Sequence, residues 1–135
     1  MDGRLINKRK ITIAIVDSSS IIRQMLSLLV ERDVRFKLFG AFANGTELIT
    51  NDEEISCFPS VCLLDIVMPT FRSFQTARFL KEKYPKINIF GYSSYSQGAH
   101  MYGINKDHCN LGFQRDKWKI TQLLDIIYEE CRSLN

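Results

Sequence analysis

Val61-Cys62-Leu63-Leu64-Asp65-Ile66-Val67-Met68-Pro69 is the stretch that decides the fold. Its first four residues are apolar, which is typical of a strand buried on both faces of a parallel sheet. Asp65 follows at once, and a Met-Pro turn comes three residues later. An ionised carboxylate is rarely buried without a partner. We therefore expect Asp65 at the carboxyl end of a central strand, where open α/β sheets bind their ligands.

Apolar runs alternate with amphipathic segments on both sides of this stretch. Further strands are predicted at 11–16, 36–43, 87–92 and 111–113, and helices at 21–31, 46–51, 74–84, 98–107 and 119–133. Strands that alternate with helices form a parallel sheet covered on both faces. The prediction is a flavodoxin-like three-layer αβα sandwich, with a five-stranded parallel sheet in the order 2-1-3-4-5.

Length and charge suit one ordinary globular domain. The chain has 135 residues and a net charge of +3, which does not by itself indicate nucleic-acid binding. Residues 1–10 are predicted to form a flexible leader before a single domain at 11–135. The leader carries a basic cluster, which is either a solvated tail or a contact for nucleic acid or an acidic partner. Its members are Arg4, Lys8, Arg9 and Lys10.

Cysteine usage and hydropathy predict a cytoplasmic protein that makes no membrane contact. The four cysteines form no CxxC pair, and Cys62 lies inside the predicted buried strand, so reduced structural thiols are expected. The N-terminus has no apolar signal region, and no apolar run approaches membrane-spanning length.

The strand ends of a parallel sheet meet at one edge, and polar residues follow several of them. These are Asp17 and Ser18, then Asp65, then Ser93 and Ser94, and finally Arg115, Asp116 and Lys117. Asp17 and Asp65 together could hold a hard divalent cation through oxygen ligands. A carboxylate beside such a cation can act as a nucleophile toward phosphorus.

Five stretches carry a resemblance that extends over about residues 11–133. They are Ile13-Ala14-Ile15-Val16-Asp17-Ser18, Ala43-Asn44-Gly45-Thr46-Glu47-Leu48, Leu63-Leu64-Asp65-Ile66-Val67-Met68-Pro69, Lys83-Tyr84-Pro85 and Gly112-Phe113. With them the chain resembles the receiver domains of two-component response regulators, especially those of the NarL/FixJ type. The third stretch is the most specific of the five.

The resemblance implies a role for each matching residue. Asp65 would be the phosphoacceptor, Asp17 and the backbone carbonyl of Val67 would help it hold Mg²⁺, Ser93 would be the switch hydroxyl and Phe113 the switch aromatic. The implied protein is a signalling module rather than an enzyme. Its implied partners are a histidine kinase or phosphotransfer protein, a downstream protein that reads the surface near the fourth and fifth strands, and a second copy in a homodimer. No direct contact with nucleic acid is expected.

Two departures keep an alternative open. Ser18 stands where the family usually has a second acidic residue, and Asp116 aligns with the usual lysine. The alternative is a pseudo-receiver, an interaction module that works without phosphorylation. A flavodoxin-type cofactor binder or small hydrolase is a third class. It fits less well because the first strand leads into Asp-Ser-Ser-Ser rather than a glycine-rich phosphate loop.

Overall fold

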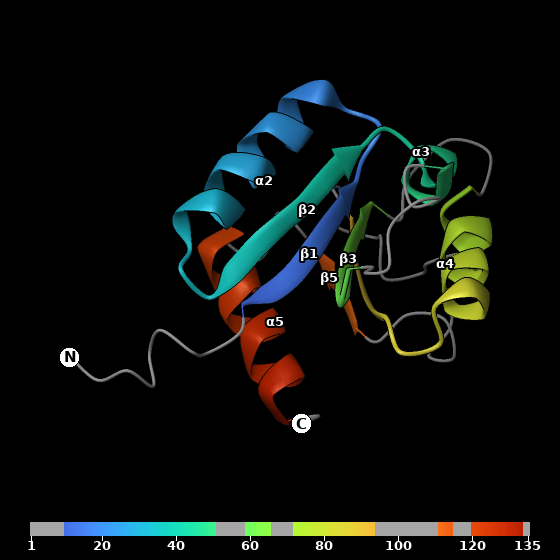
Figure 1. Cartoon of the computed structure of the whole chain (residues 1–135). Helices are drawn as coiled ribbons and strands as arrows, with labels where there is room; N and C mark the ends of the chain where they lie inside the picture. The colour runs from blue at the N-terminus through green and yellow to red at the C-terminus, as the bar shows by residue number, and fades with distance from the viewer. Residues whose placement is uncertain (1–9, 51–58, 66–71, 94–110, 115–119, 134–135) are drawn as a thin grey trace.

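The computed structural model describes residues 10–50, 59–65, 72–93, 111–114 and 120–133. Strands and helices alternate along them, except that no helix is described between the last two strands (Figure 1). In chain order they are β1 (Ile11–Val16), α2 (Ser20–Arg32), β2 (Phe36–Phe42), α3 (Gly45–Thr50), β3 (Val61–Asp65), α4 (Arg72–Lys83), β4 (Asn88–Ser93), β5 (Leu111–Gln114) and α5 (Ile120–Ser133). The helix predicted at 98–107 lies outside the described residues.

All the described strands run parallel in one sheet, in the order β2-β1-β3-β4-β5. Helices α2 and α5 cover one face of this sheet, and α3 and α4 cover the other (Figure 1). The parallel α/β architecture predicted from the sequence is therefore confirmed. Because the strands are parallel, their carboxyl ends share one edge, which we call the rim.

The core has two halves, one on each face of the sheet. Strand β3 contributes to both, since Val61 and Leu63 face the α2 and α5 side while Cys62 and Leu64 face the α3 and α4 side. All four side chains are fully buried. The apolar run before Asp65 is thus a central strand buried on both faces, as its sequence predicted.

Helix α2 begins at a serine cap. The Ser19 hydroxyl accepts a hydrogen bond from the Ile22 N–H at 3.3 Å, which satisfies one of the unpaired donors of the first turn. The structure thus places the N-cap of α2 at Ser19.

Helix α2 buries Leu26 and Val30 against the sheet, as expected for one face of an amphipathic helix. The same spacing also predicts burial of Met25, yet this residue is 37% exposed. Together with Ile21 and Leu28 it forms an exposed apolar stripe at positions i, i+4 and i+7.

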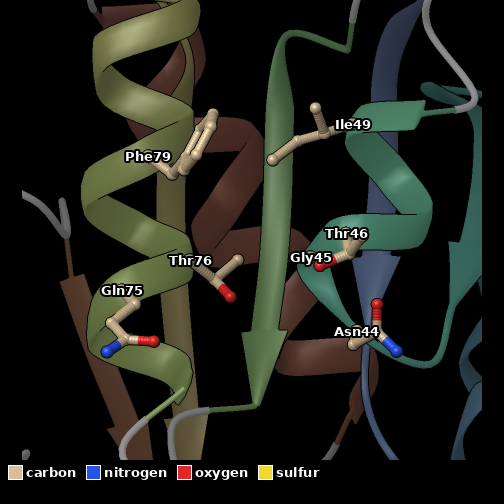
Figure 2. A pocket seen from close by; sticks show the side chains of 7 residues that line it. All are labelled: Asn44, Gly45, Thr46, Ile49, Gln75, Thr76 and Phe79. Carbon is tan, nitrogen blue, oxygen red and sulfur yellow. The ribbon is translucent and has the colours of Figure 1, made fainter.

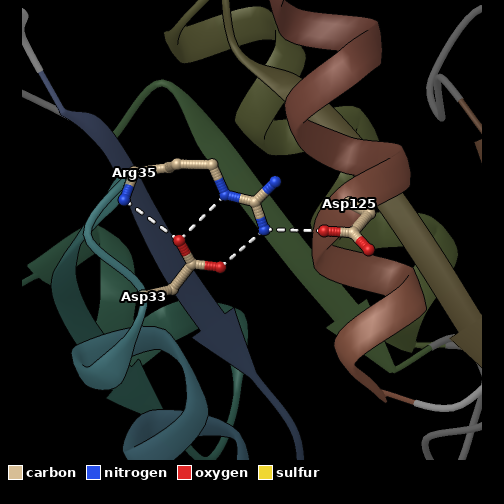
Figure 3. Close-up of polar contacts among 3 residues, drawn as sticks. All are labelled: Asp33, Arg35 and Asp125. Atoms are coloured by element: carbon tan, nitrogen blue, oxygen red, sulfur yellow. Dashed lines mark hydrogen bonds and ion pairs between the residues drawn. The ribbon is translucent and has the colours of Figure 1, made fainter.

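Arg35 joins the α2–β2 connection to α5 (Figure 3). Its guanidinium binds both carboxylate oxygens of Asp33, at 2.9 Å and 2.7 Å, and also donates to Asp125 on α5 at 2.8 Å. It lies over the Tyr128 ring as well, 4.9 Å from the ring centre. Hydrogen bonding to Arg35 lowers the pKa of the Asp33 carboxyl, and the same pair raises the pKa of Arg35.

The two cysteines among the described residues are buried and form no disulfide with each other. Cys62 lies in β3, and Cys131 lies on α5 against the core. Burial raises the pKa of the Cys131 thiol to about 11, so it stays protonated at neutral pH. No described helix has the length and apolar character needed to span a bilayer.

Candidate functional site

Asp65 ends β3 at the rim, and its side chain is partly exposed. Strand register brings its neighbours into line. Val16 pairs with Leu64, so Asp17 and Asp65 follow directly on two adjacent strands. On the other side, Asp65 itself pairs with Tyr92 of β4. The two aspartates that the sequence predicted at this edge therefore occupy neighbouring positions along the rim.

Asp17 is buried, and hydrogen bonds within the protein hold it in place. It is 1% exposed, and its backbone N–H donates to the Phe42 carbonyl at 3.0 Å. One carboxylate oxygen, Oδ1, accepts the Ser19 N–H at 2.8 Å, and the other, Oδ2, accepts the hydroxyl of Tyr92. The Asp17 carbonyl accepts a guanidinium N–H of Arg23 at 2.7 Å. Every polar group of Asp17 thus has a partner within the protein.

Tyr92 reaches Asp17 across an intervening strand. Tyr92 belongs to the same core half as Ile15 and Leu63, on the α2 and α5 side of the sheet. Residues two apart on a strand share a face, so Asp17 and Asp65 continue that face from Ile15 and Leu63. The Tyr92 ring lies in this buried layer with 1% exposure. Its hydroxyl donates a hydrogen bond to Asp17 at the rim end of this layer.

The other predicted site residues are only partly described. Ser93 is the last residue of β4, and Phe113 pairs with Tyr92 from β5, which places both backbones at the same edge region as Asp65. Ser18 follows Asp17 and is exposed. Val67, Asp116 and the cations beside Asp116 lie outside the described residues.

The rim offers oxygen ligands of the kind that Mg²⁺ prefers, but it offers few of them. Asp17 and Asp65 offer hard carboxylate oxygens, which are the ligands Mg²⁺ prefers. Among the described residues, no group of three or more His, Cys, Asp or Glu side chains is placed to hold a metal ion. Any cation would also share Asp17 with the donors that already bind both of its oxygens.

A groove of about 370 Å³ opens between α3 and α4 (Figure 2). Asn44 and Gln75 lie at one end of it, and Ile49 and Phe79 at the other. Asn44 caps α3 by accepting the Glu47 N–H at 3.0 Å. Gly45 sits against the buried Thr76 of α4, where a Cβ would come within 2.6 Å of the threonine methyl. The glycine therefore permits the close approach of the two helices.

Sequence reasoning assigned no role to Tyr92. The signal was present, because a buried tyrosine needs a partner for its hydroxyl. The polar residues that end the neighbouring strands were the available candidates. Which of them lay within reach depended on the strand register, which periodicity does not specify.

Solved structures share this fold along most of the chain. The NarL signal receiver domain of Mycobacterium tuberculosis superposes with a TM-score of 0.76 over 93% of this chain and 98% of that one. The chain has the receiver fold. The isolated RcsB receiver domain of Salmonella enterica serovar Typhimurium superposes with a TM-score of 0.72 over 90% of both chains. Sequence identity is 15% in each case, so these neighbours establish the receiver fold alone.

Curated relatives match the receiver-fold chain over part of their own length. A protein-glutamate methylesterase/protein-glutamine glutaminase of Pyrococcus abyssi is 31% identical over 77 residues, which are 57% of this chain and 20% of that protein. The transcriptional regulatory protein YdfI of Bacillus subtilis is 28% identical over 72 residues, or 53% of this chain and 33% of that protein. The match thus spans about a fifth to a third of these relatives. No protein-family model matches the chain.

Proposed function

We propose that this chain is a receiver module of a two-component phosphorelay and that it accepts a phosphoryl group on Asp65. The observation that carries the proposal is the position of Asp65. It is a partly exposed carboxylate at the end of the central strand of a receiver fold, beside the buried Asp17. A nucleophile needs access from solvent, and a partner carboxylate on the next strand suits a cation-assisted transfer.

The transfer would make one bond and break one. An Asp65 carboxylate oxygen attacks the phosphorus of a phosphohistidine on a kinase or phosphotransfer protein. A P–O bond forms, the P–N bond breaks, and the histidine nitrogen leaves with its electron pair. Asp65, Asp17 and the Val67 carbonyl would hold Mg²⁺, which neutralises charge on the phosphoryl oxygens. Ser93 and Phe113 keep their predicted switch roles within this proposal.

The exposed stripe of α2 supports a protein partner for this step. Ile21 and Leu28 are 74% and 52% exposed, which is uncommon for large apolar side chains grouped on one helix face. Ile21 lies four residues after Asp17, so the stripe starts at the rim. A donor protein that covers the stripe would bring its phosphohistidine to the edge that carries Asp65. The downstream partner is proposed to read the surface near β4 and β5.

Intact-mass spectrometry tests the proposal. The protein is incubated with Mg²⁺ and a small phosphodonor, beside the variant Asp65→Asn. The wild type should gain the mass of one phosphoryl group and the variant should not. Glu47→Gln is a matched control, since it also removes a carboxylate, and it should be modified like the wild type. Equal modification of wild type and Asp65→Asn would contradict the proposal.

A second candidate is the pseudo-receiver. The observation that favours it is the saturation of Asp17 by the Ser19 N–H and the Tyr92 hydroxyl, together with Ser18 in place of a second acidic residue. Such a module would bind its partner in one state only. A wild-type protein that stays unmodified at high phosphodonor and Mg²⁺ concentrations, yet binds its partner, would establish this candidate instead.

A further inference from the structure

We propose that Tyr92 is a latch on Asp17, because its hydroxyl competes with a divalent cation for the Asp17 carboxylate. Cation binding at the rim would then require this hydrogen bond to break. The inference rests on the proposed function for its choice of cation site. It adds a residue that controls the site, on a strand from which no cation ligand was expected.

The hydrogen bonds of Asp17 indicate for which of its carboxylate oxygens Tyr92 and a cation would compete. Oδ1 of Asp17 accepts the Ser19 N–H in the turn that leads into α2, and the Ser19 side chain in turn caps that helix. This oxygen is therefore fixed by the start of α2. Oδ2 is the oxygen that the Tyr92 hydroxyl binds. A cation shared between Asp17 and Asp65 needs a carboxylate oxygen, and Tyr92 already uses the one that the helix does not hold.

Burial makes the hydrogen bond costly to replace. Both Asp17 and Tyr92 are 1% exposed, so water does not readily substitute for either partner. A hydrogen bond to an ionised group is also stronger than one between neutral groups. Mg²⁺ gives up its hydration shell reluctantly and binds well only where several oxygens are supplied. Because Ser18 supplies no carboxylate, the site offers Mg²⁺ few oxygens. The Tyr92 hydroxyl is therefore expected to compete well with the cation for Asp17.

Release of the latch would act on the strands beside it. Tyr92 pairs with Asp65 on one side and with Phe113 on the other. A change in the Tyr92 side chain therefore occurs between the proposed phosphoacceptor and the strand proposed to face the downstream partner. Cation binding and the state of the β4 and β5 edge would be linked through this one hydroxyl.

Calorimetric titration with Mg²⁺ alone tests the latch. Tyr92→Phe removes the hydroxyl and keeps the ring, so it should bind Mg²⁺ more tightly than the wild type by roughly tenfold or more. Asp17→Asn should bind weakly with either residue at position 92. Tyr128→Phe removes a hydroxyl from a half-buried ring on α5 and should match the wild type. Equal or weaker Mg²⁺ binding by Tyr92→Phe would overturn the latch.

A second measurement uses the unaltered protein, so it stands even if a variant fails to fold. In protein carrying ¹³C-labelled tyrosine, Mg²⁺ should shift the ring resonances of Tyr92 more than those of Tyr84 and Tyr128. Unchanged Tyr92 resonances at saturating Mg²⁺ would overturn the latch. No phosphodonor is present in either experiment. Failure of the latch therefore leaves phosphorylation of Asp65 intact, and failure of phosphorylation leaves the Mg²⁺ result readable.

Discussion

The hydroxyl of Tyr92 on β4 donates a hydrogen bond to the carboxylate of Asp17 on β1, although β3 lies between these two strands. This hydrogen bond lies at the rim end of the buried layer beneath α2 and α5. It also links the first strand to the fourth at the edge where Asp65 is partly exposed. The stability of this edge and its capacity for a cation therefore depend on the same pair.

The first prediction concerns the free energy of unfolding. Tyr92→Phe leaves the buried Asp17 carboxylate without one donor and should cost about 1–3 kcal/mol. Asp17→Asn should cost a similar amount. The double variant should lose less than the sum, by about 0.5–3 kcal/mol, because the two residues share one interaction. Urea unfolding of the four proteins gives the coupling. Additive losses would show that the pair does not interact in solution.

The second prediction concerns acid stability. Arg35 lowers the pKa of Asp33 below its ordinary value, so the folded state binds a proton there less readily than the unfolded chain. The stabilisation is fully present above the unfolded pKa, near 4, and is lost as the pH falls through the lower folded pKa. Asp33→Asn should therefore flatten the fall in melting temperature below about pH 4. Asp125→Asn removes the partner on α5, which is 64% exposed, and should change the curve little.

Sequence reasoning reached the fold because its signals are local. The apolar run before Asp65, the β-branched β1 and the serine cap each specify their own element. Polar residues directly after strands then place Asp17 and Asp65 at the rim, because parallel strands end at one edge. Strand bounds differed by one residue at most, as where β2 ends at Phe42 rather than Ala43.

The rest depended on contacts between distant segments. The partner of Tyr92 is 75 positions away along the chain, and it is set by the register of three strands. The exposure of Met25 depends on how α2 packs against the sheet, which the periodicity of the helix does not specify. The link from Arg35 to Asp125 spans 90 positions and left no pattern in the sequence.

The third prediction concerns the contact between α3 and α4. Gly45→Ala gains helix propensity worth about 1 kcal/mol or less. A Cβ there would lie 2.6 Å and 2.7 Å from side-chain atoms of Thr76, which is buried and stiff about χ1. Overpacking of this kind costs about 1–3 kcal/mol, so the variant should be destabilised overall. In a Thr76→Ala background the same substitution should cost less. An equal cost in both backgrounds would place the strain elsewhere.

The fourth prediction separates partner docking from chemistry. Leu28→Glu puts a charge in the exposed stripe of α2 and should slow phosphoryl transfer from a protein donor, while a small phosphodonor should react as before. Val34→Glu is the matched control, because Val34 is 81% exposed and follows α2 outside the stripe. The transfer rate is measured with each donor for each variant. Equal slowing by both substitutions, or slowing with the small donor as well, would remove α2 from the docking surface.

The central claim is that Asp65 accepts a phosphoryl group, and peptide mapping of the modified protein tests it most directly. Wild-type protein is treated with Mg²⁺ and a small phosphodonor, digested, and searched for the added phosphoryl mass. We expect that mass on the peptide that contains Asp65, and its absence from the same peptide of Asp65→Asn. A phosphoryl group on the Asp17 peptide, or on no peptide at saturating phosphodonor, would contradict the claim.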